Sequence, residues 1–145
     1  MKRRFSVANI SLKDNIYTYL AAETALTALL DTGGIGWGQM PDTAVTKKMI
    51  TYTMISDVRT PESQFRNQRW RFWISFPAGG TAPKNSCLTA GNQLLTSLHN
   101  MRGTFGSTKI HFIENDSNQD PFYDSVSDSW MIIQDYKFKM RTLET

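Results

Sequence analysis

The apolar residues near the start of the chain repeat with the spacing of an amphipathic helix. Six of them fall on one side of a helical wheel: Leu12, Ile16, Tyr19, Leu20, Leu26 and Leu30. Ser11 can cap this helix, Asp14 places an acid in its first turn, and Gly33-Gly34 can end it. Residues 12–30 are therefore predicted to be helical. Glu23 lies near the middle of the apolar stripe, where a carboxylate must find a partner or face water.

The next clear pattern has the period of two that is typical of β-strands. Residues 49–56 alternate, with Ile50, Tyr52 and Met54 on one side. Residues 67–76 alternate more strongly: one face holds Gln68, Trp70, Phe72, Ile74 and Phe76, and the other holds Arg69, Arg71, Trp73 and Ser75. A polar segment, residues 57–66, joins the two and predicts a hairpin with a long, exposed tip. Residues 35–48 have no clear period and are predicted to be a loop with room for a short edge strand.

A second helix is predicted after the glycine pair Gly79-Gly80. Pro83 stands near its first position, where the missing N–H costs nothing, and Gly103 ends it. Its buried stripe consists of Cys87, Leu94, Leu95, Leu98 and Met101, with Ala90 and Gly91 allowing close approach. Residues 108–114 and 129–141 are then predicted to be strands, separated by an acidic loop, residues 114–128.

The order of these elements, α-β-β-α-β-β, predicts an α+β fold. Two amphipathic helices covering one face of a four- to five-stranded, mostly antiparallel sheet would bury every apolar stripe. The length of 145 residues fits a single domain, 1–145, with a basic N-terminal arm at residues 1–10. No apolar run approaches the roughly 20 residues of a membrane-spanning helix. The basic N-terminus is not followed by an apolar stretch or a cleavage site, so secretion is not expected.

Candidate chemistry is sparse. His99 and His111 have no acids at triad spacing, and Cys87 lies on the inward stripe of its helix, where a thiol acts as a small hydrophobe. The glycine pairs do not form a phosphate-binding loop. The acids between residues 116 and 128 recur every four residues but lack a calcium-loop pattern. We therefore expect no enzymatic activity, no cofactor and no metal, and the lone cysteine, which cannot form an intramolecular disulfide, indicates assembly in a cytoplasm.

The charged surface is the most informative remaining feature. With 16 basic and 13 acidic residues, the formal charge is +3, too small to require nucleic acid as a partner. If helices cover the Trp70 face, Arg69 and Arg71 look outward and Trp73 carries an indole into solvent. Such a face is either an ordinary mixed surface or an interface rich in hot-spot residues. The basic strands and the acidic loop either join neighbouring subunits head to tail or neutralise each other within one subunit.

The layout of the chain resembles the tail terminator proteins of long-tailed bacteriophages, which complete the tail and join it to the head. The matching features are an early helix ending in leucines (Leu26, Leu29, Leu30), a loop with Pro41 leading into a hairpin, a second helix containing Ala90-Gly91-Asn92-Gln93-Leu94-Leu95, and closing strands. The acidic insertion and the long basic hairpin face depart from the family pattern.

The resemblance implies a non-enzymatic virion protein that forms a hexameric ring on the last layer of the tail tube. Such a ring stops tube polymerisation, binds the head-completion connector, and lets DNA pass through its lumen without sequence-specific contacts; no membrane is involved. Candidate interface positions lie on the hairpin tip, the outward strand face and the acidic loop: Arg59, Pro61, Arg66, Arg69, Arg71, Trp73, Asp116, Asp120 and Asp124.

Three other interpretations remain open from the sequence. The chain can be another neck or connector protein or a tail-tube subunit, which would stack into polymers instead of closed rings. It can be a single-stranded nucleic-acid-binding module that stacks bases on Trp70 and Trp73 beside Arg69 and Arg71. It can also be a small enzyme that uses His99 or His111 as a base.

Overall fold

The computed structural model describes residues 12–59, 65–105 and 108–141. The first part of the described chain holds two helices, α1 (Lys13–Ala21) and α2 (Thr24–Thr27), and three strands, β1 (Ile35–Trp37), β2 (Met49–Arg59) and β3 (Phe65–Pro77). Helix α3 (Pro83–Leu98) follows, and then strands β4 (Gly103–Phe105), β5 (Thr108–Asn118), β6 (Phe122–Asp124) and β7 (Ser129–Arg141).

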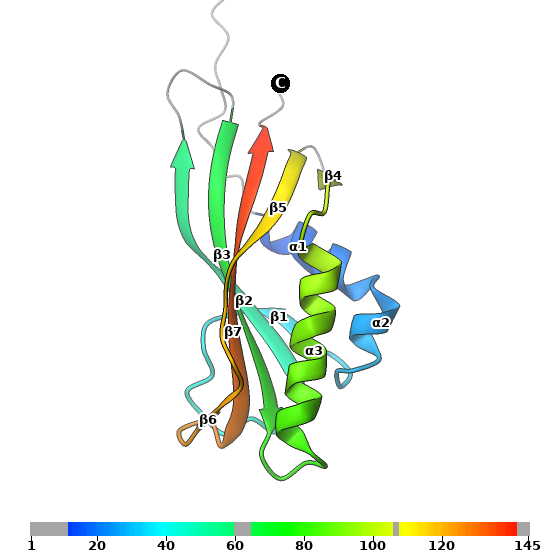
Figure 1. The fold of residues 1–145 in the computed structure, drawn as a ribbon, viewed down its shortest axis with the longest axis vertical. Coiled ribbons are helices and arrows are strands. Elements are labelled where there is room, and N and C mark those ends of the chain that lie inside the picture. The colour runs from blue at the N-terminus through cyan, green and yellow to red at the C-terminus, as the bar shows by residue number, and fades with distance from the viewer. Residues whose placement is uncertain (1–11, 60–64, 106–107, 142–145) are drawn as a thin grey trace, which may run out of the picture.

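The strands form one twisted sheet in the order β1-β2-β3-β7-β5-β4, with β6 pairing with β7 beyond the end of β5. Only β1 and β2 run parallel; the other pairs are antiparallel. Figure 1 shows α3 lying along one face of this sheet, with α1 and α2 beside it. The upper halves of β2, β3, β7 and β5 extend past the helices (Figure 1).

The predicted fold class was wrong in both layers. The described chain has a seven-stranded, curled sheet and three helices, where four or five strands and two helices were expected. Strands β1, β4 and β6 have three residues each, too few for an alternating pattern to reveal them. The first predicted helix is split because Glu23, the N-cap residue before α2, adopts an extended conformation with φ −81° and ψ 93°.

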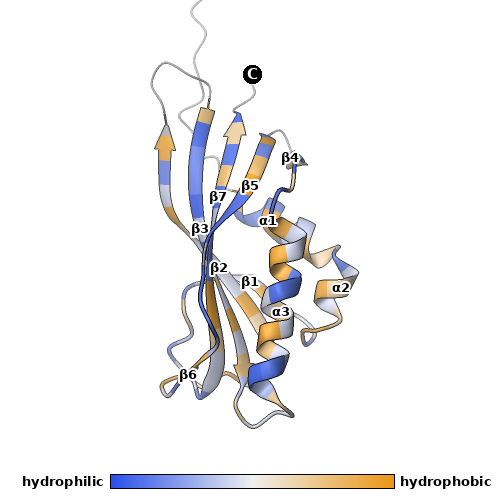
Figure 2. Cartoon of the chain, in the orientation of Figure 1, coloured by the Kyte–Doolittle hydropathy of each residue, from blue (hydrophilic) through white to orange (hydrophobic). Residues whose placement is uncertain are grey.

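The core lies between the sheet and the helices. The inward residues of β3, from Trp70 to Phe76, pack with the α3 side chains Cys87, Leu94 and Leu98, all of them buried. Gly91 permits the close approach expected for α3, because a Cβ there would stand 3.0 Å from Cδ1 of Ile132. The α3 ribbon carries both apolar and polar segments, and much of β5 is hydrophilic (Figure 2). The helix is therefore amphipathic, with its apolar side on the sheet.

Candidate functional site

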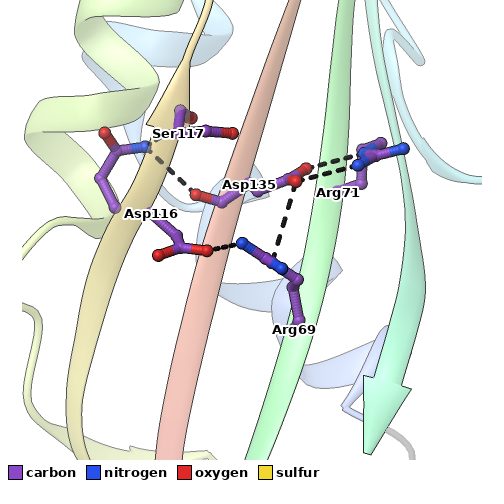
Figure 3. A network of polar contacts seen from close by, with 6 residues as sticks. Arg69, Arg71, Asp116, Ser117 and Asp135 are labelled. Atoms are coloured by element: carbon purple, nitrogen blue, oxygen red, sulfur yellow. Dashed lines mark hydrogen bonds and ion pairs between the residues drawn. The ribbon is translucent and has the colours of Figure 1, made fainter.

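The face of the sheet opposite α3 carries a network of charged side chains from three adjacent strands. Arg69 and Arg71 extend from β3, Asp135 from β7, and Asp116 from an irregularity in β5. Arg69 forms an ion pair with Asp116, and its Nε lies 3.8 Å from Oδ2 of Asp135. Figure 3 shows the four side chains converging across the strands. Basic and acidic residues thus neutralise each other within one subunit, one of the two arrangements that the sequence allowed.

The strongest contact of this network joins Arg71 to Asp135. Nε and Nη2 of Arg71 donate to the two carboxylate oxygens of Asp135 at 2.8 and 3.0 Å, the bidentate geometry favoured by a guanidinium. The hydrogen bond to this carboxylate raises the pKa of Arg71. Asp135 itself is 4% exposed. The pair therefore ties β3 to β7 and leaves only the outer side of the arginines to meet a partner.

The predicted positions near the hairpin tip lie partly outside the described chain. Pro61 lies outside the described residues, and only the backbone of Arg59 is described, at the end of β2. Arg66 is 6% exposed, and its Nε donates to Oδ1 of Asp57 at 2.7 Å. The Arg66 side chain is thus committed to a contact between β2 and β3.

Trp73 is covered, and the expectation that it carries an indole into solvent was wrong. It is 7% exposed, although it lies on the outward face of β3. The segment after β1 passes over this face, since the hydroxyl of Thr51, the register partner of Trp73 on β2, donates to the Gln39 carbonyl. Trp70 is 1% exposed on the opposite face. The two indoles therefore do not provide the stacking platform that a single-strand-binding module would need.

The acidic segment contributes to strands more than to a free loop. Asp116 lies in β5 and Asp124 in β6, while Asp120 is exposed between them. The Asp124 carboxylate accepts hydrogen bonds from the backbone N–H and the hydroxyl of Ser127 at 3.0 and 2.6 Å. In the described part of the chain, no group of three or more His, Cys, Asp or Glu side chains could hold a metal ion.

The three candidate chemical groups are buried or in contact with neighbouring groups of the fold. Burial raises the pKa of the Cys87 thiol to about 12, so it stays protonated and is a poor nucleophile at neutral pH. Nδ1 of His99 accepts the backbone N–H of Asn115 at 3.1 Å, and the ring of His111 packs against Phe65 at 4.9 Å. Within the residues described, no helix is long and apolar enough to cross a membrane.

One edge of the sheet is covered along β5. Strand β4 pairs with residues 108–110 of β5. Beyond it, the Ile113 carbonyl accepts from Asn100 at 2.7 Å and the Ile113 N–H donates to Met101 at 3.1 Å. The His99 imidazole then takes the next outward N–H, that of Asn115. Strand β4, the backbone of residues 100–101 and the His99 ring thus provide partners for backbone groups of β5 between Thr108 and Asn115.

The opposite edge of the sheet is open along β2. Strand β1 pairs only with Ile50–Tyr52 of β2, and no strand of the described chain pairs with Thr53–Arg59 on that side. Three apolar side chains stand exposed along this stretch: Met54 at 40%, Ile55 at 44% and Val58 at 58%. Trp37, the last residue of β1, is 60% exposed. Sequence reasoning missed this surface, although the adjacent apolar residues Met54-Ile55 break the alternation of the strand and mark the irregularity there.

Comparisons with known proteins support the fold alone. Neither a protein-family profile nor a curated protein sequence matches the chain. A solved structure described as the virion of a native gene transfer agent particle contains a chain of similar fold. The TM-score is 0.69 at 13% sequence identity, and the match covers 95% of this chain and 99% of that chain. This chain is thus similar in its whole architecture to one component of that particle.

Proposed function

We propose that this protein is a structural component of a phage-like virion, and that it acts as a tail terminator. The observation that carries the proposal is the likeness in fold to a chain of a gene transfer agent virion, which spans nearly the full length of both chains. The resemblance in layout to tail terminators, argued from the sequence, gives the same class of protein independently. A virion subunit works through its surfaces, so its function needs no active site.

The charged network supports this role in a specific way. The ion pairs of Arg69 and Arg71 link three adjacent strands across the outward face. A face whose side chains are held by such pairs suits a subunit that must present the same surface to its neighbours in every copy. Under the proposal, copies of the chain form a closed, hexameric ring in the neck of the virion. The tail tube protein and the head connector bind the two sides of the ring, and DNA passes through its lumen.

The experiment that tests the proposal adds the purified chain to tail tubes polymerised from the cognate tube subunit. Light scattering and negative-stain images are then recorded with and without the protein. We expect closed rings, at one end of each tube, that stop further growth. Long homopolymers of the chain would instead identify a tube subunit. Tubes that keep growing at saturating protein would rule out a terminator, as would turnover of a small molecule that depends on one polar side chain.

A further inference from the structure

Backbone groups of β2 beyond Tyr52 point toward an edge on which none of the described strands pairs with them. The N–H of Ile50 donates to Gly34 at 2.6 Å, and the Tyr52 carbonyl accepts from Gly38 at 2.9 Å, so both residues direct their polar backbone groups toward the β1 side. Alternate residues of a strand point the same way, and Met54 therefore directs its N–H and carbonyl to the open side. Past the irregularity between Met54 and Ser56, the register with β3 gives Asp57 the same direction.

Three of the four exposed side chains along the described part of this edge are apolar, where an ordinary edge would carry protecting residues. Natural sheets blunt exposed edges with lysines, prolines, very short strands or covering segments. Here Met54, Ile55 and Val58 are exposed together with Ser56, the Asp57 carboxylate is paired with Arg66, and an irregularity follows Met54. The β5 edge of the same sheet, in contrast, has backbone partners from Thr108 to Asn115. The contrast marks β2 as an interaction surface.

A second unpaired strand edge lies on the far side of the β3–β7 pair. Strand β6 pairs with β7 through Phe122–Asp124, and no other described strand pairs with it. Tyr123 on β6 is 48% exposed, and Val126 in the following turn is 64% exposed. Contacts that join identical subunits in a ring need two different surfaces on each copy, one meeting the other on the next copy. Two strand edges on opposite sides of the described sheet, each with exposed apolar or aromatic side chains and no paired strand, meet that requirement.

We infer that β2 of one copy pairs with the β6 edge of a second copy, so that the sheet continues from subunit to subunit. The inference deepens the proposed function and rests on it for the closure of the ring. Main-chain hydrogen bonds between the two edges would supply the pairing, and the exposed apolar side chains of both would be buried. The occupant of the β2 edge is thus another molecule of this chain.

The test uses one charged substitution on each edge and a complementation experiment. Val58→Lys places a charge on the β2 edge, Tyr123→Lys places one on the β6 edge, and Leu88→Lys on α3 is the matched control at an exposed apolar site away from both edges. Sedimentation of the full-length chain is followed over a wide concentration range. We expect Val58→Lys and Tyr123→Lys each to weaken self-association at least tenfold, while Leu88→Lys behaves like the wild type.

Mixing the two edge variants gives the decisive result. The Val58→Lys chain keeps its β6 edge and the Tyr123→Lys chain keeps its β2 edge, so an equimolar mixture should form a one-to-one heterodimer that grows no further. Because Tyr123 donates to Asp128, Val126→Lys serves as a second β6-side variant if Tyr123→Lys fails to fold. No heterodimer in mixtures of folded variants, or a wild-type chain that stays monomeric at every concentration, would overturn the inference.

The two sets of experiments distinguish a failure of the β2–β6 contact from a failure of the proposed function. Rings that cap tail tubes but are insensitive to Val58→Lys would leave the terminator role intact and remove the β2–β6 contact. Association that responds to the edge variants, with no effect of the protein on tail tubes, would support the β2–β6 contact and remove the terminator role.

Discussion

The two edges of this sheet differ in how their backbone groups are paired. Along β5, the short strand β4, the backbone of residues 100–101 and the ring of His99 occupy the outward groups. Along β2, β1 pairs only with Ile50–Tyr52, and none of the described strands pairs with the rest of this edge, where apolar side chains are exposed. Within the described residues, local segments therefore cover one edge of the sheet and leave most of the other edge without a paired strand. The difference lies in short segments, not in the long strands.

The largest expected effect comes from proline at neighbouring positions of β2. The alternation fixed by Ile50 and Tyr52 turns the Thr53 N–H toward β3 and the Met54 N–H toward the open edge. Thr53→Pro should cost about 1–3 kcal/mol for the lost ladder hydrogen bond alone, and the fixed φ of proline adds strain to that in an extended strand. Met54→Pro should cost less than about 1 kcal/mol in the dilute monomer, since proline is tolerated on a free edge. Urea unfolding measures both, and equal losses would show that the Met54 edge is occupied within the chain.

A second prediction concerns Tyr52, at the point where the open edge begins. Its hydroxyl donates to the Lys13 carbonyl at 2.5 Å, and burial, with a contribution from the Asp14 carboxylate, raises its pKa to about 12. The phenol of the unfolded chain ionises near pH 10. The difference between this pKa and that of the folded state therefore contributes to the free energy of unfolding in full below pH 10, and this contribution is lost as the pH rises toward 12. Its size is roughly 2–3 kcal/mol. Tyr52→Phe should lose stability less steeply than the wild type over that window; parallel curves would contradict the assignment.

The third prediction concerns the close packing of Gly34, the residue before β1, against the backbone of Lys48, the residue before β2. A Cβ on Gly34 would stand 2.5 Å from the Lys48 carbonyl oxygen and 2.8 Å from that of Asp31, both of them backbone atoms. Gly34→Ala should therefore destabilise the fold by about 1–3 kcal/mol. Gly36→Ala, two residues along β1, meets no atom within 4 Å and should be close to neutral. Thermal unfolding of the two variants compares them directly. A neutral Gly34→Ala would mean that the backbone around Gly34 is not closely packed.

The smallest effect is expected on the covered edge. His99→Ala removes the acceptor of the Asn115 N–H and should cost about 0.5–1.5 kcal/mol. Amide hydrogen exchange gives a sharper readout, because the Asn115 amide should lose protection while the Ile113 amide, bonded to Met101, keeps it. In the wild type, the Met54 and Asp57 amides should exchange fast in the dilute monomer. Protection there at low concentration would erase the contrast between the edges.

Patterns within the chain were enough for the long elements. The alternation of residues 49–56 and 67–76 located β2 and β3, and the stripe around Gly91 located α3, because burial of one face leaves a periodic trace in the sequence. The lack of a reactive thiol could also be anticipated, since Cys87 lies on that buried stripe. The split after α1 could not, because Glu23 was read as an odd member of one stripe and not as the residue that ends it.

The partners of the charged residues were decided by tertiary structure alone. Whether Arg69 and Arg71 serve another subunit or this one depends on β7 and β5 lying next to β3, which brings Asp135 and Asp116 beside them from far along the chain. The cover over Trp73 and the openness of β2 likewise depend on where the non-periodic segment after β1 runs. A sequence by itself determines which faces are apolar, because that property is local. Which strand edges and charged side chains lack a partner is a property of the packed chain, because their partners come from segments that are distant in the sequence.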